Sequence, residues 1–214
     1  MPSLESGRHE AWVWGPAAVL IGLAYGVIMR NGAWFWPGMA LLMALLGTWS
    51  WLAGRGHHHP ALRVSLRDTA IGALLGVFLY GAAWLAHATV GSVVPSLTSG
   101  LAVVLQWAGA YPVWVQVGAI AVIAPGEELF WRRLLLDRLY HWGLRSWWKA
   151  LGVSTLLYAA IHLLTGNPWL ALAALGFGFI WGAIALLTGN TWTAIVCHLV
   201  YDLLMFVWLK LPGY

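Results

Sequence analysis

Long apolar segments separated by short polar ones run through almost the whole chain. An apolar stretch of about 20 residues can cross the roughly 30 Å hydrocarbon core of a bilayer as a helix. About seven segments are long enough by this criterion. They lie near residues 11–29, 34–53, 69–90, 112–136, 148–165, 168–187 and 190–210. The pattern therefore predicts an all-α, polytopic transmembrane helix bundle of about seven spans.

The segment 92–111 leaves an eighth span open. It carries no charge, but Pro95 and Gly100 interrupt it. A re-entrant or short extra helix is as compatible with this composition as a loop. Because a full crossing here would reverse the orientation of every later span, the distribution of charge becomes informative.

Basic residues favour seven spans, since they gather on the cytoplasmic side of membrane proteins. Seven spans and a cytoplasmic N-terminus leave only Arg30 and Lys210 outside. The residues then on the inside are Arg8, Arg55, Arg63, Arg67, Arg138, Arg145 and Lys149. An eighth span would move the last three of these to the outside, against the rule.

Composition agrees with a membrane protein. Of the 214 residues, 61% are hydrophobic and 8% are charged, whereas about a quarter of a soluble domain is charged. The 17 tryptophans suit many membrane crossings, because their amphipathic rings prefer the headgroup level. The first apolar segment is too long, and repeated too often downstream, for a cleaved signal peptide. We expect a single multi-pass domain over residues 1–214 in the cell membrane.

The net charge, a histidine run and the single cysteine do not indicate a functional site. The net charge of +4 is spread over scattered residues, so no nucleic-acid face is expected. The histidine run within 54–60 is expected to be a polar loop, because adjacent loop residues lack the facing geometry of metal ligands. Cys197 is the single cysteine and cannot form an intramolecular disulfide, so we expect a small buried thiol.

Ionisable residues inside the apolar segments are the informative ones. A charge at the bilayer centre costs on the order of 3 kcal/mol, so five unpaired charges would cost on the order of 10 kcal/mol or more. Pairing or function must offset that cost. The charged residues are Glu127, Glu128, Arg132, Arg133 and Asp202, and His162 and His198 lie in similar surroundings.

Helix geometry sorts the acidic pair, because residues four apart share a face and neighbours point about 100° apart. Glu128 and Arg132 are four apart and are predicted to form an ion pair. Glu127 is left on another face without a partner on its own helix. Pro125 and Gly126 precede the pair and predict a helix kink or restart, which would place both carboxylates in a first turn near the positive end of the helix dipole.

The same spacing of four recurs at Tyr158 and His162 and at His198 and Asp202. An aspartate one turn from a histidine can accept its ring proton, and a tyrosine one turn before a histidine can orient the ring. Each pair alone also has a structural explanation as a satisfied interhelical contact. Packing does not require a free glutamate, two histidines and an aspartate on three spans, so their joint occurrence favours a functional site.

These residues form three ordered motifs: Glu127 to Arg132 as EExxxR, Tyr158 to His162 as [F/Y]xxxH, and His198 to Asp202 as HxxxD. The second half of the chain, about residues 112–210, thereby resembles the CPBP family of intramembrane proteases. This family comprises the type II CAAX prenyl endopeptidases and bacterial relatives called Abi or bacteriocin-processing proteins. The resemblance implies a catalytic core over 112–210, with residues 1–111 supplying accessory N-terminal spans.

The resemblance implies that Glu127 is the catalytic carboxylate and that His162, His198 and Asp202 complete the site. It implies further that Glu128 and Arg132 form a supporting ion pair. The chain departs from the family pattern twice. Tyr158 stands where phenylalanine is common, and Asp202 stands where CAAX endopeptidases typically have asparagine, although bacterial members often have aspartate.

The chemistry expected is peptide hydrolysis by an activated water, without a cofactor. Arg132 would keep Glu128 ionised, so the two carboxylates take different roles, with Glu127 as the general base. We assign His162 to the water and His198 with Asp202 to the oxyanion. The partners implied are a bilayer and a membrane-associated protein or peptide substrate.

Three alternatives stay open from the residues alone. Glu127, His162 and His198 could instead hold a catalytic zinc, although no HExxH motif is present. Buried Glu, His and Asp also mark proton-coupled transporters, and a non-catalytic immunity or scaffold protein could keep the fold. The substrate is equally open among a prenylated peptide, a bacteriocin leader, an anchored regulator and a C-terminal sorting tag.

One geometric difficulty accompanies the shared site. Straight spans would place Glu127 in the inner half of the membrane and His162 near the outer end of its helix. The break at 166–168 is therefore predicted to lie below the interface and to bring His162 toward the depth of Glu127.

Overall fold

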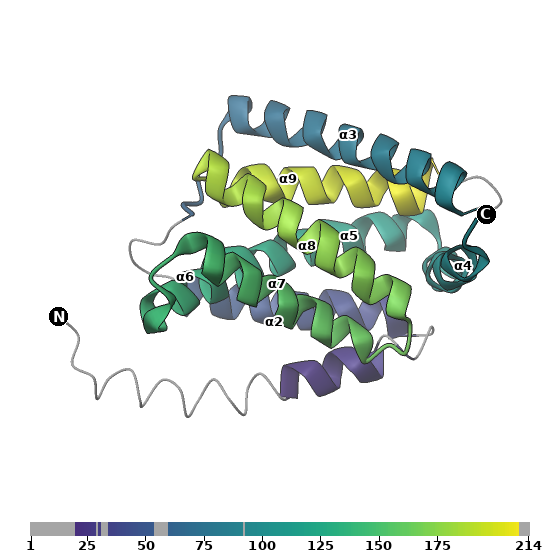
Figure 1. Ribbon diagram of the computed structural model, residues 1–214, viewed down its shortest axis with the longest axis horizontal. Coiled ribbons are helices and arrows are strands. Elements are labelled where there is room, and N and C mark those ends of the chain that lie inside the picture. Colours follow the sequence, from purple (N-terminus) through teal and green to yellow (C-terminus); the bar gives the residue numbers. More distant parts are fainter. Residues whose placement is uncertain (1–19, 29, 31–33, 54–59, 92, 210–214) are drawn as a thin grey trace.

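The protein is a bundle of α-helices in a computed structural model that describes residues 20–28, 30, 34–53, 60–91 and 93–209 (Figure 1). The part of the chain so described contains no β-strand, and its one isolated β-bridge joins Ala61 to Asn190. The predicted all-α fold class is confirmed. The histidine run within 54–60 and the first part of the segment 11–29 lie outside the described residues.

The helices follow the apolar segments closely. Five of them are long and apolar enough to cross a membrane: α2, α3, the continuous helix of residues 113–144, α8, and residues 191–208. The helical residues 20–28 and the 17-residue α7 correspond to the other two predicted spans. The full set is residues 20–28, α2 (Phe35–Ala53), α3 (Leu66–Val90), α4 (Pro95–Gly109), α5 (Val113–Glu128), η2 (Leu129–Leu135), α6 (Leu136–Leu139), η3 (Tyr140–Leu144), α7 (Trp147–Leu163), α8 (Pro168–Thr188), α9 (Thr191–Asp202) and η4 (Leu203–Trp208).

The undecided segment 92–111 contains the helix α4. Its 15 residues rise about 22 Å in all, less than the hydrocarbon thickness. Figure 1 shows α4 nearly end-on while its neighbours lie in the plane of the view, so α4 runs across one end of the bundle. It is an extra helix rather than an eighth span parallel to the others.

Two glycines on α3 bring its backbone against α9. A Cβ added at Gly72 would lie 2.6 Å from the carbonyl oxygen of Thr193, and one at Gly76 would lie 2.7 Å from that of Cys197. Small residues four apart permit such close helix approach in membranes. Cys197 is a free, fully buried thiol at this contact, as the sequence predicts.

A second close approach joins α2 to α5 directly before the acidic pair. A Cβ at Gly47 would lie 3.2 Å from the Cα of Gly126, and a Cβ at Gly126 would collide with the carbonyl oxygen of Met43. The contact is therefore between backbones and leaves little room for either helix to shift. It sets the position of the two glutamates that follow Gly126.

The prediction that Pro125 and Gly126 place the two glutamates in a first helical turn is wrong. Pro125 lies inside α5, and Glu127 and Glu128 form its last residues rather than a first turn. The helix then continues as the π-helix η2, with Leu129 still in the right-handed region at φ −63° and ψ −40°. Membrane helices tolerate proline in this way because neighbouring helices and local π turns satisfy the freed backbone groups.

A break follows α7 at the position that the sequence indicates. Leu163 ends α7, Gly166 adopts a positive φ of 79°, and Pro168 begins α8. Asn167 caps α8 by accepting from the backbone N–H groups of Trp169 and Leu170, and its Nδ2 donates to the carbonyl of Gly100 at 2.7 Å. This turn thus also holds α4 against the bundle.

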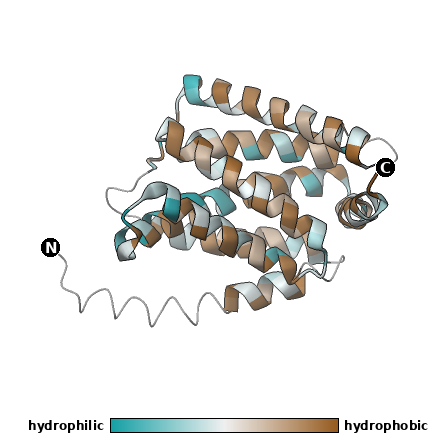
Figure 2. Ribbon diagram, in the orientation of Figure 1, coloured by the Kyte–Doolittle hydropathy of each residue, from teal (hydrophilic) through white to brown (hydrophobic). Residues whose placement is uncertain are grey.

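Polar residues gather at the end of the bundle opposite α4. Figure 2 shows the most hydrophilic stretches around α6 and at the start of α3. That end carries five described basic residues, namely Arg63, Arg67, Arg138, Arg145 and Lys149. The positive-inside rule therefore predicts that this end faces the cytoplasm and that α4 lies at the opposite end.

Candidate active site

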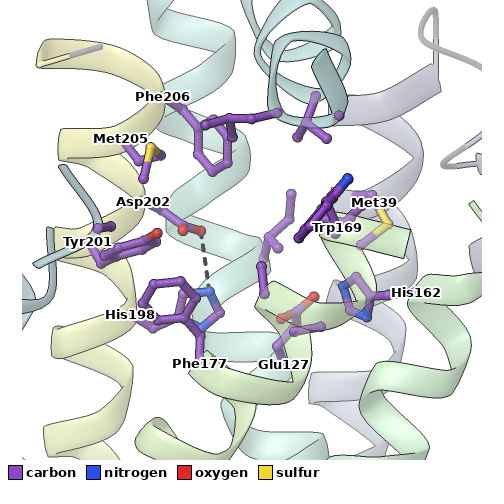
Figure 3. A pocket seen from close by; sticks show the side chains of 18 of the residues that line it. Met39, Glu127, His162, Trp169, Phe177, His198, Tyr201, Asp202, Met205 and Phe206 are labelled. Atoms are coloured by element: carbon purple, nitrogen blue, oxygen red, sulfur yellow. Dashed lines mark ion pairs between the residues drawn. The ribbon is translucent and has the colours of Figure 1, made fainter. Parts of the chain in front are cut away.

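A pocket of about 340 Å³ lies inside the bundle, in the half nearer α4. Its walls are mostly apolar and aromatic, and each of the three sequence motifs contributes polar side chains to the lining (Figure 3). Tyr25 and His87, from outside the motifs, line it as well. The lining includes Phe35, Met39, Val104 and Phe177 on the apolar side, and Glu127, His162, His198 and Asp202 on the polar side. The structure therefore brings together all four residues that the sequence places in the site.

Glu127 is buried at the edge of this pocket. Its Oε2 accepts a hydrogen bond from the hydroxyl of Tyr158 at 2.5 Å. No ion pair among the described residues includes Glu127. Figure 3 shows its carboxyl between the two imidazole rings of His162 and His198. Glu127 is thus a carboxylate that faces a cavity without being neutralised by a direct cation.

His162 lines the pocket, and its hydrogen bonds indicate which ring nitrogen carries the proton. Its Nδ1 lies 2.7 Å from the carbonyl oxygen of Tyr158. Because a carbonyl can only accept, Nδ1 carries a proton, and in the neutral ring Nε2 then carries the lone pair. The hydroxyl of Tyr25 lies 2.6 Å from that Nε2 and donates to it.

His198 lies between two carboxylates. Its Nδ1 is 2.9 Å from Oε1 of Glu128, and its Nε2 is 3.3 Å from Oδ2 of Asp202. Because both nitrogens face carboxylate oxygens, the arrangement is that of an imidazolium which donates on both sides. The indole of Trp181 stacks on the ring, with centroids 3.5 Å apart and planes 15° apart, and holds its orientation.

The predicted pair of Glu128 and Arg132 is present and buried. Arg132 Nη1 lies 3.4 Å from Glu128 Oε1, and Nη2 donates to the carbonyl of Gly178 at 3.2 Å. The guanidinium carbon also lies 4.7 Å from the centroid of the Tyr158 ring. Glu128 therefore joins two cations, Arg132 on its own helix and His198 on α9, whereas the spacing along the chain indicates only the first.

Tyr158 connects Glu127 to His162, two residues that straight spans would place at different depths in the membrane. Its hydroxyl contacts the Glu127 carboxyl, and its ring lies 4.5 Å from the His162 ring, centroid to centroid. A Cβ at Gly178 would lie 2.8 Å from Tyr158 Cδ1, so the glycine makes room for this ring. One side chain thus spans the gap between the two motif residues.

Two residues of the site are absent from the sequence prediction. Tyr25 lies on the helical residues 20–28 and contacts His162, and Trp181 lies on α8 and stacks on His198. Both stand in apolar segments where aromatic residues are common. The available signal was weak: Tyr25 is the one tyrosine of its segment, and Gly182 next to Trp181 indicates close packing.

A base that faces a cavity, ringed by hydrogen-bond donors and closed by apolar helices, can activate a water against a carbonyl. Comparison with known families agrees with this chemistry, since residues 109–204 match the family described as type II CAAX prenyl endopeptidase Rce1-like. We refer to these matched residues as the Rce1-like domain. Searches of curated proteins and of solved structures returned no match.

The Rce1-like domain contains all three motifs, from Glu127 to Asp202. The predicted resemblance and the predicted enzyme class, a protease, are therefore confirmed. The matched range stays close to the predicted core of 112–210. The helices before residue 109 lie outside it, although Tyr25, Phe35 and Val104 from those helices line the same pocket.

The zinc alternative does not fit the arrangement of donors. A zinc ion needs the lone pair of a neutral imidazole, but both nitrogens of His198 face carboxylates and Nε2 of His162 accepts from Tyr25. Within the described residues, no group of three His, Cys, Asp or Glu side chains is spaced to hold a metal ion. The side chains would have to rearrange before they could ligate one.

Proposed function

We propose that this protein is a glutamic-type intramembrane endopeptidase, with Glu127 as the general base. The observation that carries the proposal is the Glu127 carboxylate, which faces the pocket with a hydrogen bond from Tyr158 and no ion pair among the described residues. A carboxylate in this state is free to take a proton from water. The Rce1-like domain favours hydrolysis over proton-coupled transport, which the buried ionisable residues alone left open.

In the proposed reaction, Glu127 removes a proton from a water while the water oxygen adds to the scissile carbonyl carbon. The carbonyl oxygen becomes an oxyanion, and the positive charge of His198, which lines the pocket, stabilises it electrostatically. Glu127 then returns the proton to the amide nitrogen as the carbon–nitrogen bond breaks. The products are a carboxylic acid and an amine, and the enzyme regains its starting state.

Glu128, Arg132 and Asp202 hold the charge that this reaction needs. Glu128 and Asp202 keep His198 protonated from both sides, and Arg132 compensates the charge of Glu128. Because the site lies between apolar helices, these charges act at short range with little screening. The three residues thus position charge rather than exchange protons with the substrate.

We propose a membrane-associated protein or peptide as the substrate, bound with an apolar portion among the pocket walls. Phe35, Phe177 and Met205 offer a surface on which hydrocarbon is favoured over water. The natural substrate would emerge from a comparison of membrane proteomes between cells with and without the protein. Truncated membrane peptides that appear only with the active protein would identify it.

The decisive test uses the purified protein in proteoliposomes with an internally quenched, farnesylated CAAX peptide and, in parallel, the native membrane fraction. Glu127→Gln keeps an acceptor oxygen for Tyr158 but cannot act as a base. We expect cleavage to fall by about 10²- to 10⁴-fold, the range for loss of a general base. Cleavage at the wild-type rate by this variant would overturn the proposed function.

A further inference from the structure

Tyr25 enters the active site from outside the Rce1-like domain. It lies on the helical residues 20–28, is 1% exposed, and lines the same pocket as Glu127. Its ring packs edge-on against His162 with centroids 4.9 Å apart, and its hydroxyl lies 2.6 Å from Nε2. The hydroxyl also interacts with the Glu127 carboxyl, so this buried phenol lies between His162 and the proposed base at the wall of the cavity.

The direction of this hydrogen bond distinguishes Tyr25 from the other donors. Because Nδ1 of His162 donates to a backbone carbonyl, the Tyr25 hydroxyl is the donor and the neutral Nε2 is the acceptor. The hydroxyl of Tyr158 and both nitrogens of His198 donate instead to carboxylates. Hydrogen bonds to charged acceptors are about twice as strong as those to neutral ones.

The Tyr25 hydrogen is therefore more easily redirected than those of Tyr158 and His198. Rotation about the bond between the ring and the hydroxyl oxygen is enough to turn it from His162 to a new acceptor. That rotation also releases the lone pair of Nε2, which can then accept a hydrogen from the attacking water. One rotation thus frees the Tyr25 hydroxyl to donate to the substrate and frees Nε2 of His162 to accept from the water.

We infer that Tyr25 is a catalytic residue which donates a hydrogen bond to the substrate carbonyl oxygen as it becomes an oxyanion. The inference rests on the proposed function. In the resting site the hydroxyl donates to His162, and with substrate it donates to the developing charge while Nε2 of His162 accepts from the water held by Glu127. No covalent bond to Tyr25 forms, and its proton stays on the phenol.

This role gives the N-terminal helices a part in the chemistry. The matched domain begins at residue 109, so it lacks this donor by itself. A donor aimed at an oxyanion is worth about 10²- to 10³-fold in kcat. The first span would then complete the active site as well as build the bundle.

The test compares Tyr25→Phe with Tyr80→Phe in proteoliposomes. Tyr80 is a control, because it is a largely buried tyrosine whose hydroxyl donates to the carbonyl of Leu209 and it does not line the pocket. We expect Tyr25→Phe to lose about 10²-fold in kcat at nearly unchanged KM, with Tyr80→Phe close to wild type. Binding of a peptide aldehyde, whose hydrate resembles the tetrahedral adduct, should weaken by a similar factor for Tyr25→Phe alone.

Glu127→Gln, measured alongside, separates the two claims. If Glu127→Gln is inactive and Tyr25→Phe has wild-type kcat and aldehyde affinity, the role of Tyr25 is overturned and the proposed function stands. If Glu127→Gln is fully active, the proposed function fails regardless of Tyr25. A fall in kcat for Tyr25→Phe that comes with a lowered unfolding temperature and an unchanged aldehyde affinity would indicate a packing role and overturn the inference.

Discussion

Oε1 of Glu128 lies 2.9 Å from Nδ1 of His198, across 70 residues of sequence and between two different helices. The same oxygen is 3.4 Å from Arg132. Glu128 is fully buried, so the three charges are held together away from water. This contact ties the EExxxR motif to the HxxxD motif and makes the second glutamate the electrostatic centre of the site.

Removing that centre should damage both stability and activity. Glu128→Ala leaves buried Arg132 and His198 facing a missing carboxylate, and breaking a buried pair on one side costs about 3–5 kcal/mol. We expect a clearly lowered unfolding temperature in detergent and loss of cleavage. Glu128→Gln keeps the shape and one acceptor oxygen, so its unfolding temperature should lie between those of alanine and wild type. Equal stability of all three proteins would contradict the buried charge network.

Gly126 should not tolerate a methyl group. A Cβ there would collide with the backbone carbonyl of Met43, which cannot rotate away as a side chain could. Gly126→Ala should push α5 from α2, displace the adjacent Glu127 and lower cleavage by at least tenfold, since misplacement by about 1 Å can cost 10²-fold. Gly118→Ala is the control on the same helix, because nothing lies within 4 Å of its Cβ position. Equal activity of the two variants would show that the α2 contact does not position Glu127.

Metal removal should leave the activity intact. Both nitrogens of His198 and the Nε2 of His162 are engaged by protein groups, so the site has no vacant imidazole lone pair in this arrangement. We expect cleavage in proteoliposomes to survive a strong chelator, with less than one zinc per chain by elemental analysis. One tightly bound zinc per chain, with activity lost to the chelator and restored by zinc, would instead establish the metal-dependent alternative.

The pocket should open on the side away from the cytoplasm. It lies in the half of the bundle near α4, while Arg138, Arg145 and Lys149 lie at the other end. In a Cys197→Ala background, an impermeant maleimide added to intact cells should label His87→Cys, which lines the pocket, and spare Lys149→Cys. Labelling of Lys149→Cys alone would reverse the orientation and place the pocket on the cytoplasmic side.

The apolar segments and the spacing of the motifs were predictable because they depend on local properties. A run long enough to cross a bilayer needs no knowledge of its neighbours. Likewise, residues four apart share a helix face wherever the helix lies, so the contacts of Glu128 with Arg132 and of His198 with Asp202 follow from spacing.

Pro125 marks the limit of such local rules. In water, a proline at this point would end or restart a helix. In the structure, close packing of α2 on Gly126 and the π-helix η2 let the helix continue, so the glutamates close α5 instead of opening a new helix. The outcome depends on neighbours that are distant in the sequence.

By itself the sequence determined an all-α membrane bundle, three motifs and four pocket residues, since hydropathy and helical spacing are properties of single segments. Only the tertiary structure decided that Glu128 reaches His198, that Tyr158 joins Glu127 to His162, and that Tyr25 enters the site. The physical reason is that each of these contacts joins separate helices. Their relative depth and rotation are set by backbone approaches at Gly72 and Gly126 and by the room that Gly178 leaves for the Tyr158 ring, which no single segment encodes.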